Sequence, residues 1–85
     1  MKMVKVSIEL PASVLSALRE EPEAFVAEMR LVAAVKWYEL EMLSQSKAAE
    51  VAGVSRVAFL DALHRFGVTP FQTTVDELHE ESRDR

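Results

Sequence analysis

The chain contains no cysteine, which excludes both a disulfide framework and a thiolate zinc site. Its two histidines, His64 and His79, have no second metal-type ligand at helical spacing apart from ordinary carboxylates. Because a catalytic zinc site usually needs three protein ligands, we expect no metal and no cofactor. No apolar run approaches the roughly 20 residues of a membrane span, and the alternating N-terminus is unlike a signal peptide. We therefore expect a cytoplasmic protein.

Catalytic motifs are missing as well. The chain has only two glycines and so no glycine-rich phosphate loop, and no cysteine nucleophile. Neither histidine accompanies a second catalytic motif. Ser55 precedes Arg56 at the start of a predicted helix, where N-capping explains the serine fully. We therefore expect that the protein is not an enzyme.

Charge is spread unevenly over the 85 residues, whose net charge is −4. Residues 1–7 carry Lys2 and Lys5 and no acid, whereas residues 8–43 carry seven acids against three bases. Residues 44–71 have a slight excess of bases, and the last fourteen residues hold five acids. The two segments that could meet DNA, the N-terminus and residues 44–71, are therefore neutral to slightly basic.

The N-terminal residues 3–10 alternate between apolar and polar side chains. Val4, Val6, Ile8 and Leu10 face one way, which is typical of a half-buried strand. A lone strand is unstable, so the expected partner is the same strand of a second copy. Pairing with residues 69–74 is the alternative. A short chain with 49% hydrophobic residues also favours an oligomer.

Two prolines place the first two helices. Pro11 begins a helix with an apolar face that ends near Glu20, and Pro22 opens a long helix from Glu23 to Leu43. The long helix has two apolar stripes, where a single-sided amphipathic helix has one. We expect one stripe to pack within the subunit and the other against a partner; a central helix in a monomer is the alternative. The first stripe contains Leu31, Val35, Tyr38 and Met42, and the second contains Phe25, Met29, Ala33, Leu40 and Leu43. The predicted dimerisation residues are Val4, Val6, Ile8, Leu31, Val35, Tyr38 and Met42.

Residues 45–66 predict a helix-turn-helix. Gly53 supplies the positive backbone dihedral of a sharp turn, Val54 is expected to be buried after it, and Ser55 caps the second helix. Phe59 and Ala62 are expected to face the first helix. If the second helix enters a major groove, Arg56 is the best candidate for a base edge or a phosphate. The predicted DNA-binding residues are Lys47, Ser55, Arg56, Val57, His64 and Arg65.

The outward-facing side chains of the second predicted helix, which would contact DNA and are called the reading face below, also fit a purely structural motif. Val57 and Leu60 are apolar where polar readers are usual, and Asp61 is repelled by phosphate. Asp61 and Arg65 stand four residues apart, so the arginine can pair within the helix. A packing motif that serves as a protein-interaction module is therefore the alternative function.

The expected fold is mostly α, with an N-terminal β-strand and four to five helices in one compact domain. Residues 1–43 hold the strand and two helices as a dimerisation region, and residues 44–68 the helix-turn-helix, which ends at Gly67 as a C-cap. Residues 69–85 hold an extended segment and a short acidic helix, from Val75 to about Glu81, begun by the capping pattern Thr74 to Glu77.

The segment SKAAEVAGVSRVAFLDALHRFGV, residues 46–68, resembles a UPF-designated family of small prokaryotic predicted antitoxins with a helix-turn-helix. The order of the predicted elements is similar too. The resemblance implies a toxin–antitoxin setting, with a protein that binds its own promoter and neutralises a nuclease toxin, often PIN-like. The leading strand also resembles the start of a ribbon-helix-helix protein, which would place Met3, Lys5 and Ser7 in the major groove.

Overall fold

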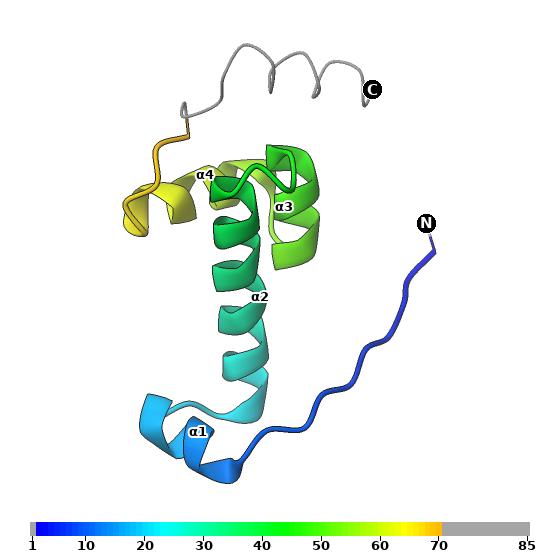
Figure 1. Ribbon diagram of the computed structural model, residues 1–85, viewed down its shortest axis with the longest axis vertical. Coiled ribbons are helices and arrows are strands. Elements are labelled where there is room, and N and C mark those ends of the chain that lie inside the picture. Colours follow the sequence, from blue (N-terminus) through cyan, green and yellow to red (C-terminus); the bar gives the residue numbers. More distant parts are fainter. Residues whose placement is uncertain (1, 71–85) are drawn as a thin grey trace.

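The computed structural model describes residues 2–70, which form four helices around one long axis. The helices are α1 (Ala12–Leu18), α2 (Pro22–Glu39), α3 (Gln45–Ala52) and α4 (Arg56–Arg65). Helix α2 is the axis; α3 and α4 lie beside its C-terminal half and α1 lies at its other end (Figure 1). The mostly helical fold is confirmed.

Helix α1 is held by its ends and buries none of its residues. The carbonyl of Pro11 accepts a hydrogen bond from the amide of Val14 at 3.0 Å, which starts the first turn. Arg19 adopts the left-handed conformation at φ 57°, and the amide of Glu20 bonds the Leu15 carbonyl at 3.1 Å. The helix therefore ends just before Glu20, as predicted, and the chain turns into α2.

Helix α2 begins at Pro22 as expected and ends at Glu39, short of the predicted end at Leu43. Leu40 caps it, and Glu41 takes the left-handed conformation at φ 63°. The amide of Met42 bonds the Trp37 carbonyl at 2.8 Å and closes this turn. The earlier end lets α3 reverse beside α2. It leaves Leu40 and Met42 outside the helix, 55% and 64% exposed.

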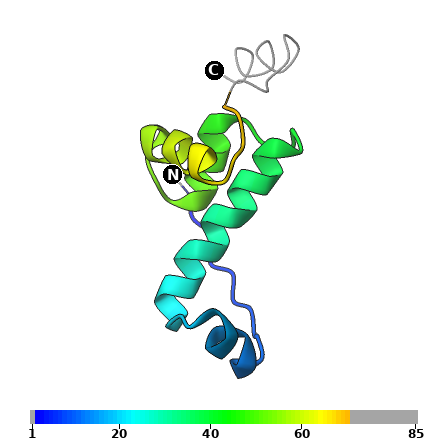
Figure 2. The same cartoon turned by 90° about the vertical axis from the view of Figure 1, so that its left-hand side faces the viewer.

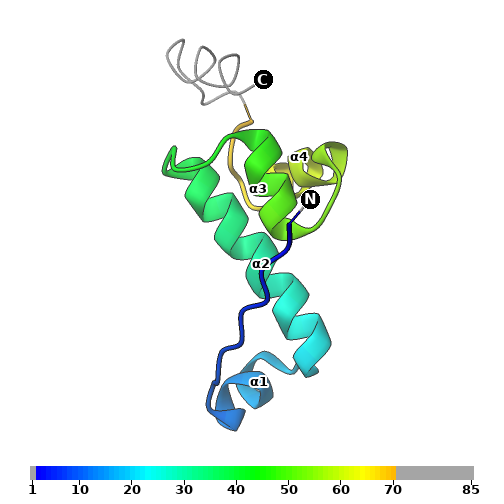
Figure 3. The same cartoon turned by 90° about the vertical axis from the view of Figure 1, so that its right-hand side faces the viewer.

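The core lies where α2, α3 and α4 meet. Phe59 and Leu63 of α4 are completely buried, and the ring of Phe59 meets that of Tyr38 edge to face at 5.9 Å. Figures 2 and 3 show α3 and α4 against the same half of α2. Helix α3 contributes small side chains, which let it approach α2 closely. The buried apolar core residues are Ala34, Val35, Tyr38, Ala48, Ala49, Ala52, Phe59, Ala62, Leu63 and Val68.

Residues 2–10 form no strand, and the described part of the chain contains none. Val4 and Val6 are 77% exposed, and Ile8 is 56% exposed. The strand predicted for residues 3–10 is therefore wrong for the single chain. The physical reason is that a strand needs a ladder partner, and the described residues of this chain offer none.

The chain after α4 follows the prediction as far as it is described. Gly67 has φ 71° and ends the helix, and the amide of Val68 bonds the Leu63 carbonyl at 2.8 Å. Val68 is buried in the core. The predicted helix from Val75 to Glu81 and most of the alternative strand at residues 69–74 lie outside the described residues. Among residues 2–70, no helix has the length and apolar character to cross a bilayer.

Candidate nucleic-acid interface

Helices α3 and α4 and the turn between them form the predicted helix-turn-helix. Gly53 sits at φ 73°, and its amide bonds the Glu50 carbonyl at 3.1 Å. The Oγ atom of Ser55 accepts from the amide of Ala58 at 3.1 Å, so Ser55 caps α4 as predicted. Val54, expected to be buried, is 38% exposed. Phe59, expected to face the first helix, is buried in the core.

Both ends of α3 are capped by side chains. The Oγ atom of Ser44 accepts from the amide of Lys47 at 3.2 Å. At the other end, the Arg30 Nε atom donates to the Val51 carbonyl at 2.8 Å. Arg30 thus crosses from α2 and satisfies a carbonyl that the helix itself leaves free. The sequence did not indicate this role of Arg30, because a capping contact between distant residues has no local signal.

A buried polar network joins α2, α3, α4 and the segment after α4. Gln45 is 8% exposed, and its Nε2 atom donates to the Tyr38 hydroxyl at 3.2 Å and to the Pro70 carbonyl at 3.1 Å. The Tyr38 hydroxyl donates to the same carbonyl at 2.9 Å. The Gln45 Oε1 atom accepts from Arg56 Nε at 3.2 Å and Nη2 at 3.0 Å. The sequence held one signal for this network: a buried tyrosine needs a hydrogen-bond partner.

Arg56, the predicted reader of a base edge, is oriented by this network. Two of its N–H groups bond Gln45, and a guanidinium has five such donors. The residue stays exposed at the first position of α4. Its remaining donors are available to an acceptor beyond the N-terminus of α4, which is the end that helix-turn-helix proteins bring to base edges.

The other predicted DNA-binding residues lie on the exposed faces of α3 and α4. Val57 is 78% exposed, and His64 lies on the same side of the helix two turns later. The Arg65 guanidinium stacks over the Phe66 ring at 5.1 Å, and within residues 2–70 it forms no ion pair with Asp61. The ammonium group of Lys47 pairs with Glu50 at 3.5 Å. Leu60, expected to face outward, is half-buried against the core.

The predicted dimerisation residues fall into two groups. Val35 and Tyr38 are 5% and 2% exposed inside the chain's own core, and Leu31 packs against them. This stripe of α2 was expected at a partner surface and is occupied by α3 and α4 instead. The remaining predicted residues are exposed: Val4, Val6, Ile8 and Met42. The second stripe, with Phe25 and Met29, is only half-buried.

Over the described residues, no group of three or more His, Cys, Asp or Glu side chains could hold a metal ion. The interface offers the three exposed cations Lys47, Arg56 and Arg65 and the exposed apolar side chain of Val57.

One family model matches the chain over residues 1–84 and is described as "Uncharacterised protein family (UPF0175)". Searches of the curated proteins and of the solved structures found no match.

Proposed function

The chain belongs to the uncharacterised protein family UPF0175, and we propose that it is a small DNA-binding transcriptional regulator of antitoxin type. It binds its own promoter as a homodimer, without enzymatic activity. Helix α4 enters the major groove.

The observation that supports this proposal best is the geometry of α3 and α4. Their turn at Gly53 and the cap at Ser55 leave the N-terminal end of α4 exposed, with Arg56 and Val57 at its first two positions. In helix-turn-helix proteins the corresponding residues contact base edges. Arg56 is suited to guanine, and the exposed methyl groups of Val57 are suited to the methyl group of thymine.

The charges around α4 set the expected strength of binding. Lys47 and Arg65 are exposed cations that can neutralise phosphates, while Asp61 on the same helix opposes them. Two cations in each of two copies give four phosphate contacts. The logarithm of the binding constant should then fall by about 3.6 per tenfold rise in salt.

A salt titration with the promoter fragment tests the proposal. Fluorescence anisotropy should show tight binding at low salt and the slope above. Lys47→Ala should weaken binding and lower the slope, whereas Lys36→Ala should change neither. The two lysines are matched: each side chain is 63% exposed, and each pairs with a glutamate three residues on. Only Lys47 lies on the helix-turn-helix.

Arg56→Ala should weaken binding to the promoter more than Lys47→Ala does, because it removes a base contact as well as a charge. Two of the five N–H donors of Arg56 bond Gln45, so three remain for DNA. Absence of salt-sensitive binding at low salt, or equal effects of Lys47→Ala and Lys36→Ala, would overturn the proposal.

The homodimer forms through residues 3–10, which pair as a strand with the same residues of a second copy. The exposed apolar side chains of Val4, Val6 and Ile8 and the lack of hydrogen bonds along this described segment support the pairing. Sedimentation equilibrium at micromolar concentration should show two copies.

Neutralisation of a nuclease toxin of PIN-like type is the second part of the proposal. It is supported by the resemblance of residues 46–68 to predicted antitoxins and by the acidic composition of residues 72–85. The protein encoded by the neighbouring reading frame should copurify with this chain and lose nuclease activity in its presence. A neighbouring frame without a nuclease would overturn this part alone.

A protein-interaction module is the second candidate function, and the exposure of Val54 and Val57 favours it. Side chains of 38% and 78% exposure at the turn and the start of α4 suit a protein contact as well as a base contact. Val57→Asp distinguishes the two candidate functions. If the surface binds only protein, the substitution abolishes binding of the protein partner, and the natural chain shows no binding to the promoter fragment.

A further inference from the structure

A groove of about 550 Å³ lies between the end of α1 and the first half of α2. Its lining is mainly apolar, with Leu18 and Val32 respectively 54% and 43% exposed. By helical spacing, this face of α2 is turned away from Val35 and Tyr38, which pack against α3 and α4. No described residue of the chain covers it. The residues that line the groove are Leu18, Glu20, Phe25, Glu28, Met29, Val32 and Ala33.

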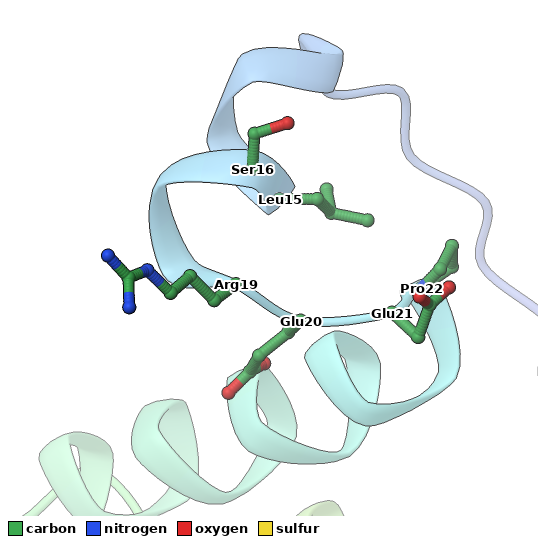
Figure 4. A pocket seen from close by; sticks show the side chains of 6 residues that line it. All are labelled: Leu15, Ser16, Arg19, Glu20, Glu21 and Pro22. Atoms are coloured by element: carbon green, nitrogen blue, oxygen red, sulfur yellow. The ribbon is translucent and has the colours of Figure 1, made fainter.

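Glu20 places an unsatisfied carboxylate oxygen beside this groove. Its side chain extends toward α2, while that of Arg19 points away from it (Figure 4). The Oε2 atom of Glu20 is buried and has no hydrogen-bond partner among the described residues. A buried acceptor without a donor destabilises the fold, so such atoms call for a missing partner. The occupant of the groove should bring apolar side chains and a donor.

Residues 2–10 provide both the apolar side chains and a hydrogen-bond donor. In an extended segment the even-numbered side chains share one face, so Lys2 lies on the same face as Val4, Val6 and Ile8. No hydrogen bond joins residues 2–10 to the rest of the described chain. Residues 2–10 contain two lysines and one acid, Glu9, whereas both charged residues of the groove are glutamates. The segment and the groove are thus complementary in polarity and in charge.

The segment of a second copy fits the groove better than the chain's own segment. Residues 2–10 leave α1 at its N-terminal end and rise apart from α2 (Figure 1). Leu18, which lines the groove, is the last residue of α1 at its other end. To enter its own groove the segment would have to reverse at Leu10 and Pro11, where the proline ring restricts both residues. From Val4 to Ile8 an extended segment spans about 13 Å, close to the roughly 12 Å between Phe25 and Ala33 along the groove.

We propose that this groove is the docking site for the N-terminal segment, residues 2–10, of a second copy of the chain. Val4, Val6 and Ile8 cover the apolar lining, and Lys2 donates to the Glu20 carboxylate. The exchange is reciprocal, because a twofold axis fills both grooves by the same contact. It also gives the paired strands of the homodimer the helical support that a two-stranded ribbon needs.

Disulfide trapping tests the docking, since the natural chain has no cysteine to interfere. Val6→Cys chains and Val32→Cys chains carry different tags, are mixed at micromolar concentration and are oxidised. The mixed disulfide should be the main product, because the two positions then lie within the roughly 7 Å between Cα atoms that a disulfide tolerates. Val57→Cys is the matched control, being 78% exposed on α4, and should give no mixed product with Val6→Cys.

Three outcomes would overturn the docking. One is a mixture in which only like chains are joined. Another is an internal disulfide within one chain of the Val6→Cys, Val32→Cys double variant, since the segment would then occupy its own groove. The third is a monomer in sedimentation equilibrium of the natural chain.

Charge reversal tests the contact with Glu20 separately. Lys2→Glu and Glu20→Lys should each raise the dimer dissociation constant about tenfold or more, and the two together should restore it. Failure of the double variant to restore the dimer would overturn that contact. All these experiments omit DNA. A trapped dimer without promoter binding would therefore refute the proposed function and leave the docking intact.

Discussion

The turn between α3 and α4 depends on a glycine and on an arginine from another helix. A Cβ atom added at Gly53 would lie 3.1 Å from Arg30 Nη2 and 3.2 Å from Arg30 Cζ. The same guanidinium group holds the Val51 carbonyl through Nε at 2.8 Å. Gly53→Ala therefore has two effects: it forces a non-glycine residue to φ 73°, and it crowds the guanidinium group of Arg30, which must shift by a few tenths of an ångström.

The contribution of each effect to the free energy of unfolding can be estimated separately. A left-handed conformation costs a non-glycine residue about 1 to 2 kcal/mol, and alanine recovers about 0.4 to 1 kcal/mol by restricting the unfolded chain. Straining the exposed Arg30 contact adds up to about 1 kcal/mol, the usual net contribution of a hydrogen bond. We expect Gly53→Ala to lower the free energy of unfolding by about 2 kcal/mol, or about 8 to 16 °C in Tm for a domain of this size.

Gly67 provides the matched control. It has nearly the same dihedral, φ 71°, but an added Cβ atom would meet nothing within 4 Å. Gly67→Ala should therefore cost only about 1 kcal/mol. Thermal unfolding followed by circular dichroism measures both variants, with Arg30→Ala as a common background. The difference between the glycines should vanish when Arg30 is absent. Equal losses in the natural background would refute the role of Arg30.

Three further substitutions test the cap, the polar network and the reading face. Ser55→Ala should lower the free energy of unfolding by about 1 kcal/mol in urea titrations, because it removes the acceptor of the Ala58 amide; an unchanged midpoint would contradict the cap. Tyr38→Phe keeps the ring but loses the bond to Pro70, so we expect a cost of about 1 to 2 kcal/mol by calorimetry. Val57→Ser, at a side chain 78% exposed, should change stability by less than about 0.5 kcal/mol. It should nevertheless alter promoter affinity in anisotropy, and unaltered affinity would exclude Val57 as a base contact.

Local signals in the sequence predicted the helices well. Pro11 and Pro22 start helices, Gly53 and Gly67 end them, and Ser55 caps α4, because each of these effects acts within a few residues of the chain. For the same reason, the helix-turn-helix was the part of the fold that the sequence predicted most directly. Its spacing of small, turn and capping residues is a property of one short segment.

Contacts between distant residues were harder to predict. Periodicity indicated two apolar stripes on α2, but it could not tell which of them α3 would cover. The stripe with Val35 and Tyr38 is the internal one, which leaves Phe25 and Met29 for a partner. Arg30 and Gln45 likewise act on residues more than ten positions away. Side chains with such partners carry no signature in their own neighbourhood.

The position of the two stripes has a consequence for the proposed dimer. The groove lies beside α1, at one end of α2, and α4 lies at the other end (Figure 1). A second copy docked in the groove would therefore leave Arg56 and Val57 uncovered, since they lie on a different helix and face away from the core. Each α2 would then act as an arm of about 27 Å between the docking site and α4. Together the two arms are longer than the roughly 34 Å that separates adjacent major grooves. A dimer built through the stripe that the sequence first suggested would instead have competed with α3 and α4 for the same side of α2.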